Sequence, residues 1–308
     1  MIDASILAAI QARLLHALAV PAVHYRPLLV GGTSMGLVDD DRAARLAGFD
    51  CLRVTPGAIT LDAALASCDA RSAALAEIAL ALREEGALPA WRDELFAVAR
   101  EFGAAPLLRI ERGAARYFGV RTWAAHVNGV VEKEGGTRMW FARRSPMKGV
   151  DPGLLDNLVG GGIAAGFRVD HTVVKEAWEE AGIPAHIARA ARAAGLLHSC
   201  KRTFDGLQRE TIFVHDLALP SDFVPANQDG EAVEHRLVDL AEAARLITQA
   251  SGAGEVTQDA SLVVLDYLLR HGEFRPDQPR YEAVAALLHR DSPLIQPGVS
   301  GAGPPDCR

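Results

Sequence analysis

The residues of this chain best suited to chemistry are three closely spaced glutamates: Glu176, Glu179 and Glu180. Residues 170–181 are predicted to form a helix, because Gly182 favours a helix end and Pro184 prevents continuation. With 3.6 residues per turn, the three carboxylates occupy an arc of roughly 100° on this helix. Clustered carboxylates on a rigid element suit Mg²⁺ or Mn²⁺, which proteins usually bind through a few carboxylates and a substrate phosphate.

An apolar stripe beside the acidic arc indicates that the helix packs on a core. The stripe comprises Val174, Ala177, Trp178 and Ala181. An acidic face turned to solvent is the competing interpretation, since like charges four residues apart cost a helix only about 0.2–0.5 kcal/mol. The glycines at 160–162 and 166 are predicted to form a flexible loop before the helix. Backbone in such a loop can approach a ligand closely, which favours a binding site.

The stretch from Gly161 to Ile183 resembles the signature of the Nudix hydrolases, G-x5-E-x7-R-E-U-x-E-E-x-G-U, in which U is aliphatic. The matching positions are Gly161, Glu176, Ala177, Glu179, Glu180, Gly182 and Ile183. Two positions depart from it: Phe167 replaces the first glutamate and Lys175 replaces the arginine. Lysine keeps the charge but cannot form the two-pronged pairing that arginine gives a carboxylate. The three main ligand positions are intact, so the departures bear on metal affinity and rate more than on the fold.

Further stretches are similar to one branch of Nudix proteins, which carries an N-terminal domain of unknown function (DUF4743-like). They include ARRSPMKGVDPGLLDNLVGGGIAAG, WRDELFAV and IERGAARYFGV, and the similarity covers roughly residues 90–290. A related Nudix unit is fused to thiamine pyrophosphokinase in fungi. The resemblance implies a substrate such as thiamine diphosphate or its oxidised analogues, cleaved to the monophosphate.

Site roles follow from the resemblance and from charge. The resemblance implies that Glu176, Glu179 and Glu180 bind the metal and act in catalysis with Lys175, while Gly161 and Gly162 contact substrate. Basic groups around a predicted strand end could hold a diphosphate. These are Arg143, Arg144 and Lys148. Glu210 and Glu231 are later candidates for a further metal ligand or the general base, and a plain surface role stays open for both.

Composition bounds the remaining possibilities. The 308 residues are 49% apolar and 23% charged, which is ordinary for a globular protein. The net charge of −7 gives no overall attraction to nucleic acid or to an anionic membrane. Four scattered cysteines without a CxxC pair fit reduced thiols in a cytoplasmic protein. No apolar run reaches the ~20 residues of a membrane span, and the start of the chain reads as an amphipathic helix, not a signal peptide.

We expect an α+β protein in which a Nudix fold, an α-β-α sandwich around a mixed sheet, follows a smaller α+β domain. The expected boundaries are 1–119 for the N-terminal extension, 120–275 for the Nudix domain, and 276–308 for a C-terminal helix and a disordered tail. The expected strands of the Nudix part include 122–131, 138–143 and 210–217, and residues 240–249 and 262–271 are expected to be helical.

The predicted function is Mg²⁺- or Mn²⁺-dependent hydrolysis of a small-molecule diphosphate, with thiamine diphosphate as the first substrate. Three alternatives stay open: a hydrolase of ADP-ribose or a dinucleotide, a sensor of the same fold that binds without cleaving, and an isopentenyl diphosphate isomerase. The isomerase needs an active-site cysteine, and the surroundings of Cys200 lack that family's motif. A homodimer is also left open.

Overall fold

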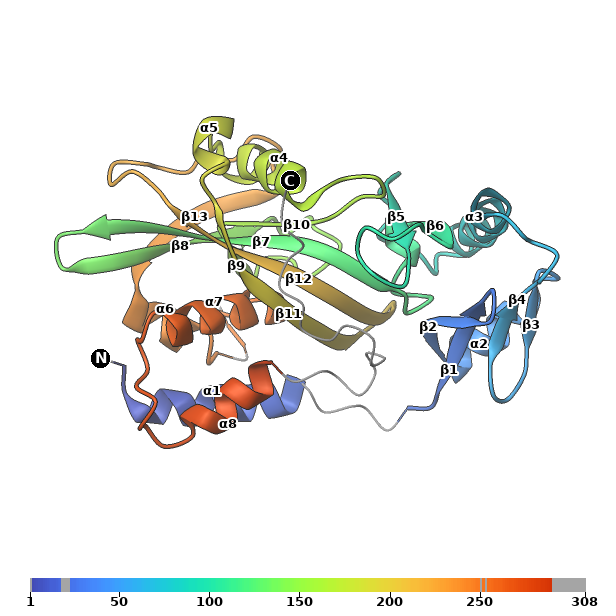
Figure 1. Cartoon of the computed structure of the whole chain (residues 1–308), viewed down its shortest axis with the longest axis horizontal. Helices are drawn as coiled ribbons and strands as arrows, with labels where there is room; N and C mark the ends of the chain where they lie inside the picture. Colours follow the sequence, from blue (N-terminus) through green and yellow to red (C-terminus); the bar gives the residue numbers. More distant parts are fainter. Residues whose placement is uncertain (1, 18–22, 250, 253, 290–308) are drawn as a thin grey trace.

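The computed structural model describes residues 2–17, 23–249, 251–252 and 254–289. A mixed sheet of seven strands forms its centre (Figure 1). Its strands are β7 (Arg121–Lys133), β8 (Gly136–Arg144), β9 (Leu155–Asn157), β10 (Val159–Gly162), β11 (Arg192–Thr203), β12 (Gly206–Ala218) and β13 (Ala232–Asp239). The main path runs β11-β12-β7-β8-β13, with β10 paired to β7 and β9 paired to β8. The β7–β12 pair is parallel and the other pairs are antiparallel, so the mixed sheet is confirmed.

Helices cover both faces of this sheet, which makes the expected α-β-α sandwich (Figure 1). One face carries α4 (Val169–Ala181) and α5 (Ala185–Ala188), and the other carries α6 (Leu240–Leu246) and α7 (Gln258–Arg270). Each face has its own apolar core, because strand side chains alternate between the two sides. β7 is buried along almost its whole length, as expected for a central strand covered on both faces.

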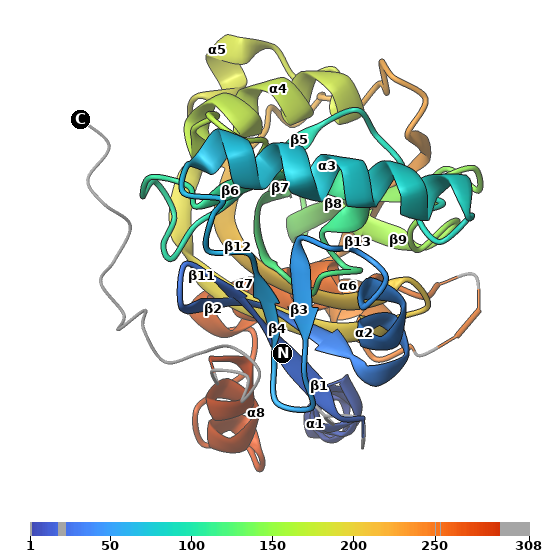
Figure 2. The ribbon, with the colours of Figure 1, turned by 90° about the vertical axis from the view of Figure 1, so that its right-hand side faces the viewer.

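A separate lobe precedes the sandwich and is built on its own apolar cluster. Its elements are β1 (Tyr25–Val30), β2 (Thr33–Asp39), α2 (Asp40–Leu46), β3 (Leu52–Val54), β4 (Ile59–Leu61), α3 (Cys68–Glu84), β5 (Leu95–Val98), β6 (Leu108–Glu111) and a 3₁₀ turn at Arg112–Ala114. β2-β1-β4-β3 form one sheet and β5-β6 another. Figure 2, seen from the side of this lobe, shows α3 and β1–β4 in front of the sandwich.

The first helix packs away from this lobe. α1 (Ala4–Ala17) lies beside α8 (Tyr281–Leu288) under α6 and α7 (Figure 1), and Leu7, Ile10 and Leu14 join the apolar cluster of the sandwich. Arg13 secures it by donating to the carbonyls of residues 247, 249 and 256. The start of the chain is therefore part of the sandwich core, although the predicted boundary groups it with the N-terminal extension. α8 is the expected C-terminal helix, and the predicted tail from 290 lies outside the described residues.

No helix in the described part of the chain is long and apolar enough to cross a membrane.

Candidate active site

The acidic helix α4 forms as the sequence predicts, one residue longer at its start. It ends at Gly182, which adopts a left-handed φ of 64° and donates to the carbonyl of Trp178 at 2.9 Å. Val173 and Ala177 are buried in the core. This packing fixes the rotation of the helix, so that Glu176 and Glu180 face the neighbouring strand β10.

The glycines before the helix are strand, not the flexible loop that the sequence suggested. Gly160 to Gly162 lie in β10 and pair with His126, Ala125 and Ala124 of β7. They are needed for close approach and not for flexibility. A Cβ on Gly161 would lie 2.4 Å from Cδ of Glu176, and one on Gly162 would lie 2.6 Å from the ring of Phe96. The missing side chain of Gly161 leaves room for Glu176 of the acidic helix, and that of Gly162 leaves room for Phe96 of the N-terminal lobe.

We expect Gly161→Ala to lower kcat by roughly a hundredfold, because the new methyl group must displace the Glu176 carboxylate, and displacements near 1 Å cost about that much. Steady-state kinetics with a hydrolysed diphosphate would measure the change. Gly57→Ala is the matched control, since a Cβ there meets nothing within 4 Å. Equal rates for the two variants would contradict the close-packing argument.

Glu180 is the most deeply placed of the three glutamates. Only 7% of it is exposed, and its Oε2 accepts a hydrogen bond from the amide of Gly160 at 2.8 Å. Burial raises its pKa to about 8; Lys148, with Nζ 3.6 Å from Oε1, opposes the shift, and Glu176 adds to it. Burial also raises the pKa of Glu176. Two carboxylates whose ionised forms are penalised by burial therefore lie together beside β10.

Lys175 neutralises the outer side of this cluster. Its Nζ is 3.0 Å from Oε1 of Glu176 and 2.6 Å from Oε2 of Glu179. Burial lowers the pKa of Lys175, but the two glutamates outweigh it and the net shift is upward. The lysine therefore stays charged and holds both carboxylates with single contacts.

The loop after β8 provides a buried lysine. Lys148 has 9% of its side chain exposed and contacts both Glu231 and Glu180. Arg92 approaches Glu231 from the N-terminal lobe at 3.8 Å. Burial raises the pKa of Glu231, but the hydrogen bond and charge of Lys148 outweigh it, with Arg92, so the net shift is downward. Glu231 is thus an ionised link between two cations.

The two arginines of β8 that were predicted to bind substrate lie in different surroundings. Arg144 lines the cavity, where NH1 is 2.7 Å from Oδ2 of Asp156. The prediction for Arg143 needs correction, because its Nε donates to Glu234 at 2.5 Å and its NH1 to the carbonyl of Gly153. Neighbouring residues of a strand point to opposite faces, so only one of the two can reach the cavity.

The N-terminal lobe supplies a wall of the cavity that sequence reasoning did not identify. Its hairpin docks on the sandwich through the carbonyl of Leu95, which accepts from the amide of Ala165 at 2.8 Å. Arg112 pairs with Glu94 at 2.7 Å, and its guanidinium lies over the ring of Phe96. The lobe contributes these lining residues: Ala90, Arg92, Phe96, Arg112, Gly113, Ala115 and Arg116. All but Ala90 fall in the stretches WRDELFAV and IERGAARYFGV, whose resemblance was noted without a role for any single residue.

A second group of acids lies at the far side of the cavity. The side-chain amide of Gln208 donates to Oδ2 of Asp259 at 2.9 Å and reaches Oε2 of Glu210 at 3.4 Å. Burial raises the pKa of Glu210, and the charge of Asp259 adds to the shift. Oδ1 of Asp259 is buried and has no hydrogen-bond partner among the described residues. Asp259 was not among the predicted site residues, because nothing in its local sequence marks it.

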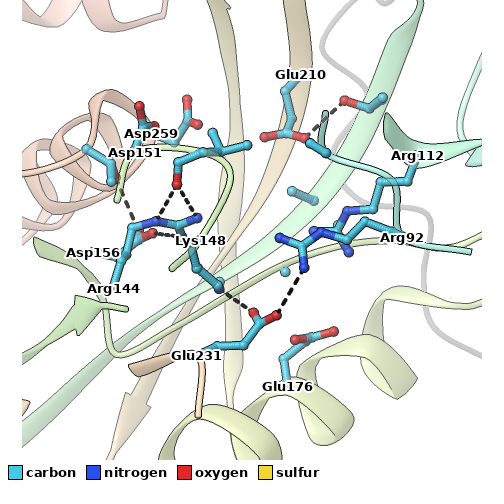
Figure 3. Close-up of a pocket in the computed structure, with 18 of the residues that line it drawn as sticks. Arg92, Arg112, Arg144, Lys148, Asp151, Asp156, Glu176, Glu210, Glu231 and Asp259 are labelled. Atoms are coloured by element: carbon cyan, nitrogen blue, oxygen red, sulfur yellow. Dashed lines mark hydrogen bonds and ion pairs between the residues drawn. The ribbon is translucent and has the colours of Figure 1, made fainter. Parts of the chain in front are cut away.

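These groups share one cavity of about 210 Å³. Figure 3 shows Glu176 and Glu231 on one side, Glu210 and Asp259 on the other, and Lys148, Arg92, Arg112 and Arg144 between and around them. The predicted residues that line it are Arg144, Lys148, Gly161, Gly162, Lys175, Glu176, Glu179, Glu210 and Glu231. Acidic side chains therefore lie at both ends of the cavity, and the cations between them are accompanied by Asp151 and Asp156 beside Arg144.

Among the described residues, no group of three or more acidic, histidine or cysteine side chains is arranged so that it could hold a metal ion by itself. Glu180 is buried without full charge compensation, and each neighbouring carboxylate raises the cost of ionising it. Oxygen donors of this kind match Mg²⁺ or Mn²⁺, which normally complete their coordination with water and phosphate.

Comparison with known proteins identifies two regions. A NUDIX domain model matches residues 122–260, and a model for a domain of unknown function (DUF4743) matches residues 10–122. Nudix hydrolase 24, chloroplastic, of Arabidopsis thaliana is 40% identical over 225 residues, which are 73% of this chain and 61% of that protein. Nudix hydrolase 20, chloroplastic, of the same plant is 38% identical over 236 residues, with 76% and 62% covered.

A solved structure from Deinococcus radiodurans is also similar, at 24% identity and a TM-score of 0.41. The match covers 57% of this chain and 99% of that one. The chain spans about three fifths of the length of the curated relatives it matches.

Proposed function

Because this chain belongs to the Nudix family, with a DUF4743 domain ahead of its NUDIX domain, we propose that it is a Mg²⁺- or Mn²⁺-dependent hydrolase of a small-molecule diphosphate. The first substrate we propose is thiamine diphosphate or one of its oxidised analogues, cleaved to the monophosphate. One observation carries the proposal: the buried carboxylate of Glu180 and the half-buried carboxylate of Glu176 adjoin a cavity that is also lined by several cations.

Glu176, Glu179 and Glu180 would hold the metal. When bound, the metal neutralises phosphate charge and makes an attacking water more acidic. The chain's own cations act on the other side of the diphosphate. Arg92, Arg112 and Lys148 line the cavity opposite α4, where charge-assisted hydrogen bonds hold phosphate oxygens and fix their orientation.

The proton of the attacking water needs an acceptor with a suitable pKa. Glu231 is a poor acceptor, because two cations lower its pKa and occupy its oxygens. Glu210 has a raised pKa but lies across the cavity from α4, beside Asp259. We therefore propose that a glutamate of α4 accepts the proton and that Glu231 keeps Lys148 in place.

Two alternatives keep specific support. A nucleoside diphosphate such as ADP-ribose presents the same diphosphate to the same cations. A sensor that binds without cleaving is favoured by Phe167, which is 44% exposed where the family signature has a glutamate, and by the lysine at 175. Catalysis is favoured by the intact glutamates, which a pure sensor would not need.

The deciding experiment measures product release from a panel of diphosphates with Mg²⁺ or Mn²⁺. The panel holds thiamine diphosphate, an oxidised analogue, ADP-ribose, NADH and isopentenyl diphosphate. We expect turnover of the thiamine compounds, lost in the double variant Glu179→Gln/Glu180→Gln and kept in the exposed-site control Asp222→Asn.

Turnover of ADP-ribose or NADH alone would support the proposal of a hydrolase and refute thiamine diphosphate as its substrate. Binding of a diphosphate without metal-dependent turnover of any compound would refute the proposal that the protein is a hydrolase and support the sensor.

A further inference from the structure

The proposed hydrolysis gives no role to the acid pair at the far side of the cavity. Phosphate oxygens are repelled by carboxylates, and Glu210 and Asp259 lie across the cavity from the acidic helix (Figure 3). The pair is nonetheless built into the fold. Gln208 bridges the two carboxylates, and Thr122 donates to Oε1 of Glu210 at 3.0 Å. Carboxylates held this way are positioned to accept hydrogen bonds from a ligand in the cavity.

The balance of charge at this end is negative. Two cations, Arg112 and Lys201, act on this end. Burial and the charge of Asp259 raise the pKa of Glu210 and outweigh the opposing charge of Arg112. Lys201 has its Nζ 2.7 Å from Oδ2 of Asp151. Burial lowers the pKa of Lys201, but the charges of Asp259, Asp151 and Glu210 outweigh it and the net shift is upward. Asp259 is 8% exposed and presents Oδ1 without a hydrogen-bond partner among the described residues. A buried carboxylate oxygen without a hydrogen bond is costly, so a ligand that donates to it gains affinity.

The order of charges along the cavity indicates the order of chemical groups along the ligand. Phosphates belong in the middle, between Lys148, Arg92 and Arg112 and the metal-binding helix. The part of the ligand that lies beyond the phosphates then meets carboxylate oxygens. N–H groups satisfy carboxylate oxygens, and an amino-substituted ring presents several of them on one rigid edge. An alkyl chain would leave the acids desolvated and unpaired.

We propose that Asp259, held by Gln208 beside Glu210, is a specificity-determining residue that accepts hydrogen bonds from an amino-substituted nitrogen heterocycle attached to the diphosphate. This inference rests on the proposed function for the placement of the phosphates. It concerns the recognition of the substrate's other end and adds no step to the hydrolysis.

A binding cycle between protein variants and ligands tests the inference. Isothermal titration of the full chain without divalent cation would compare thiamine diphosphate and ADP-ribose, which carry amino-substituted rings, with inorganic pyrophosphate, which has no such group. Wild type should bind at least one heterocyclic ligand more tightly than pyrophosphate. Asp259→Asn should reduce that affinity by roughly tenfold to a hundredfold, the range for a lost charged hydrogen bond, and leave pyrophosphate within about threefold.

Two further variants make the result decisive. Glu210→Gln should show the same ligand-dependent loss, and Asp222→Asn, an exposed acid outside the cavity, should change nothing. Melting temperatures would show that each variant folds. An equal loss for all ligands, or no loss for any, overturns the inference, as does a wild type that binds pyrophosphate as well as the heterocyclic compounds.

The same ligands assayed for turnover with Mg²⁺ keep the two claims apart. Absence of turnover with a ligand-dependent loss in Asp259→Asn would refute the hydrolase and retain the recognition site. Turnover that falls in kcat alone in Asp259→Asn would refute recognition and place the residue in the chemical step.

Discussion

Replacing Glu180 with glutamine is expected to lower kcat by on the order of a thousandfold, since it removes a proposed ligand of the metal that would neutralise the reacting phosphate. The fold should survive the change. The side chain is isosteric, and its carbonyl oxygen can still accept from the amide of Gly160. Steady-state kinetics with Mg²⁺ would measure the loss, with Asp222→Asn as the control.

The same substitution should increase the stability of the metal-free protein above neutral pH. The folded-state pKa of Glu180 is raised to about 8, above the value of 4.5 for the free side chain. The folded protein therefore binds the proton more tightly than the unfolded chain between these two values. Stability from this group is fully present below pH 4.5 and is lost as the pH rises through 8. The loss between pH 5 and 8 is about 3 kcal/mol.

Thermal or urea unfolding at pH 5 and pH 8, without metal and then with Mg²⁺, would measure this difference. Glutamine cannot ionise, so Glu180→Gln should overtake wild type as the pH rises. Mg²⁺ should restore wild type and leave the variant largely unaffected. A variant that is less stable than wild type at pH 8 without metal would show that Glu180 is not held under electrostatic strain.

The acidic helix could be predicted because its determinants are local. The spacing of the glutamates, the apolar stripe and Gly182 all lie within one element, and helix geometry converts them directly into a face. The glycines beside it could not be placed in the same way. Three successive glycines carry no alternation of side chains, so the strand they form is visible only through its pairing with β7. Their partner is more than thirty residues away in the sequence.

The wall of the cavity made by the N-terminal lobe shows a different limit. Arg112 reaches the site because Gly162, fifty positions later in the chain, leaves room for its guanidinium and for Phe96. Local patterns contain no information on such a contact. Arg143 and Arg144 show the converse: alternation along a strand already implied that only one could enter the cavity, and the strand assignment alone did not say which. Asp259 could not be predicted as a site residue for a similar reason: it lines the cavity only because α7 packs against the sheet.

Arg112 links the lobe to the proposed reaction, and replacing it with alanine is expected to raise KM by roughly tenfold to a hundredfold with a smaller effect on kcat. This is the range for losing one charge-assisted hydrogen bond to a phosphate that is bound in both the ground state and the transition state. The guanidinium is positioned by Glu94 and by the ring of Phe96, so it is preorganised before substrate arrives. Initial rates over a range of diphosphate concentrations would separate KM from kcat.

Arg109→Ala is the matched control, because this arginine lies in β6, directly before the turn that carries Arg112, pairs with the exposed Asp69 and does not line the cavity. Arg112→Lys should recover only part of the affinity, since lysine keeps the charge but not the planar fork of donors. A KM for Arg112→Ala equal to that of Arg109→Ala would mean that Arg112 does not contribute to diphosphate binding and that the lobe only shields the site from solvent. The expected result would make the DUF4743 domain a necessary half of the substrate site, so that an isolated NUDIX domain would bind the diphosphate poorly even with every glutamate of α4 intact.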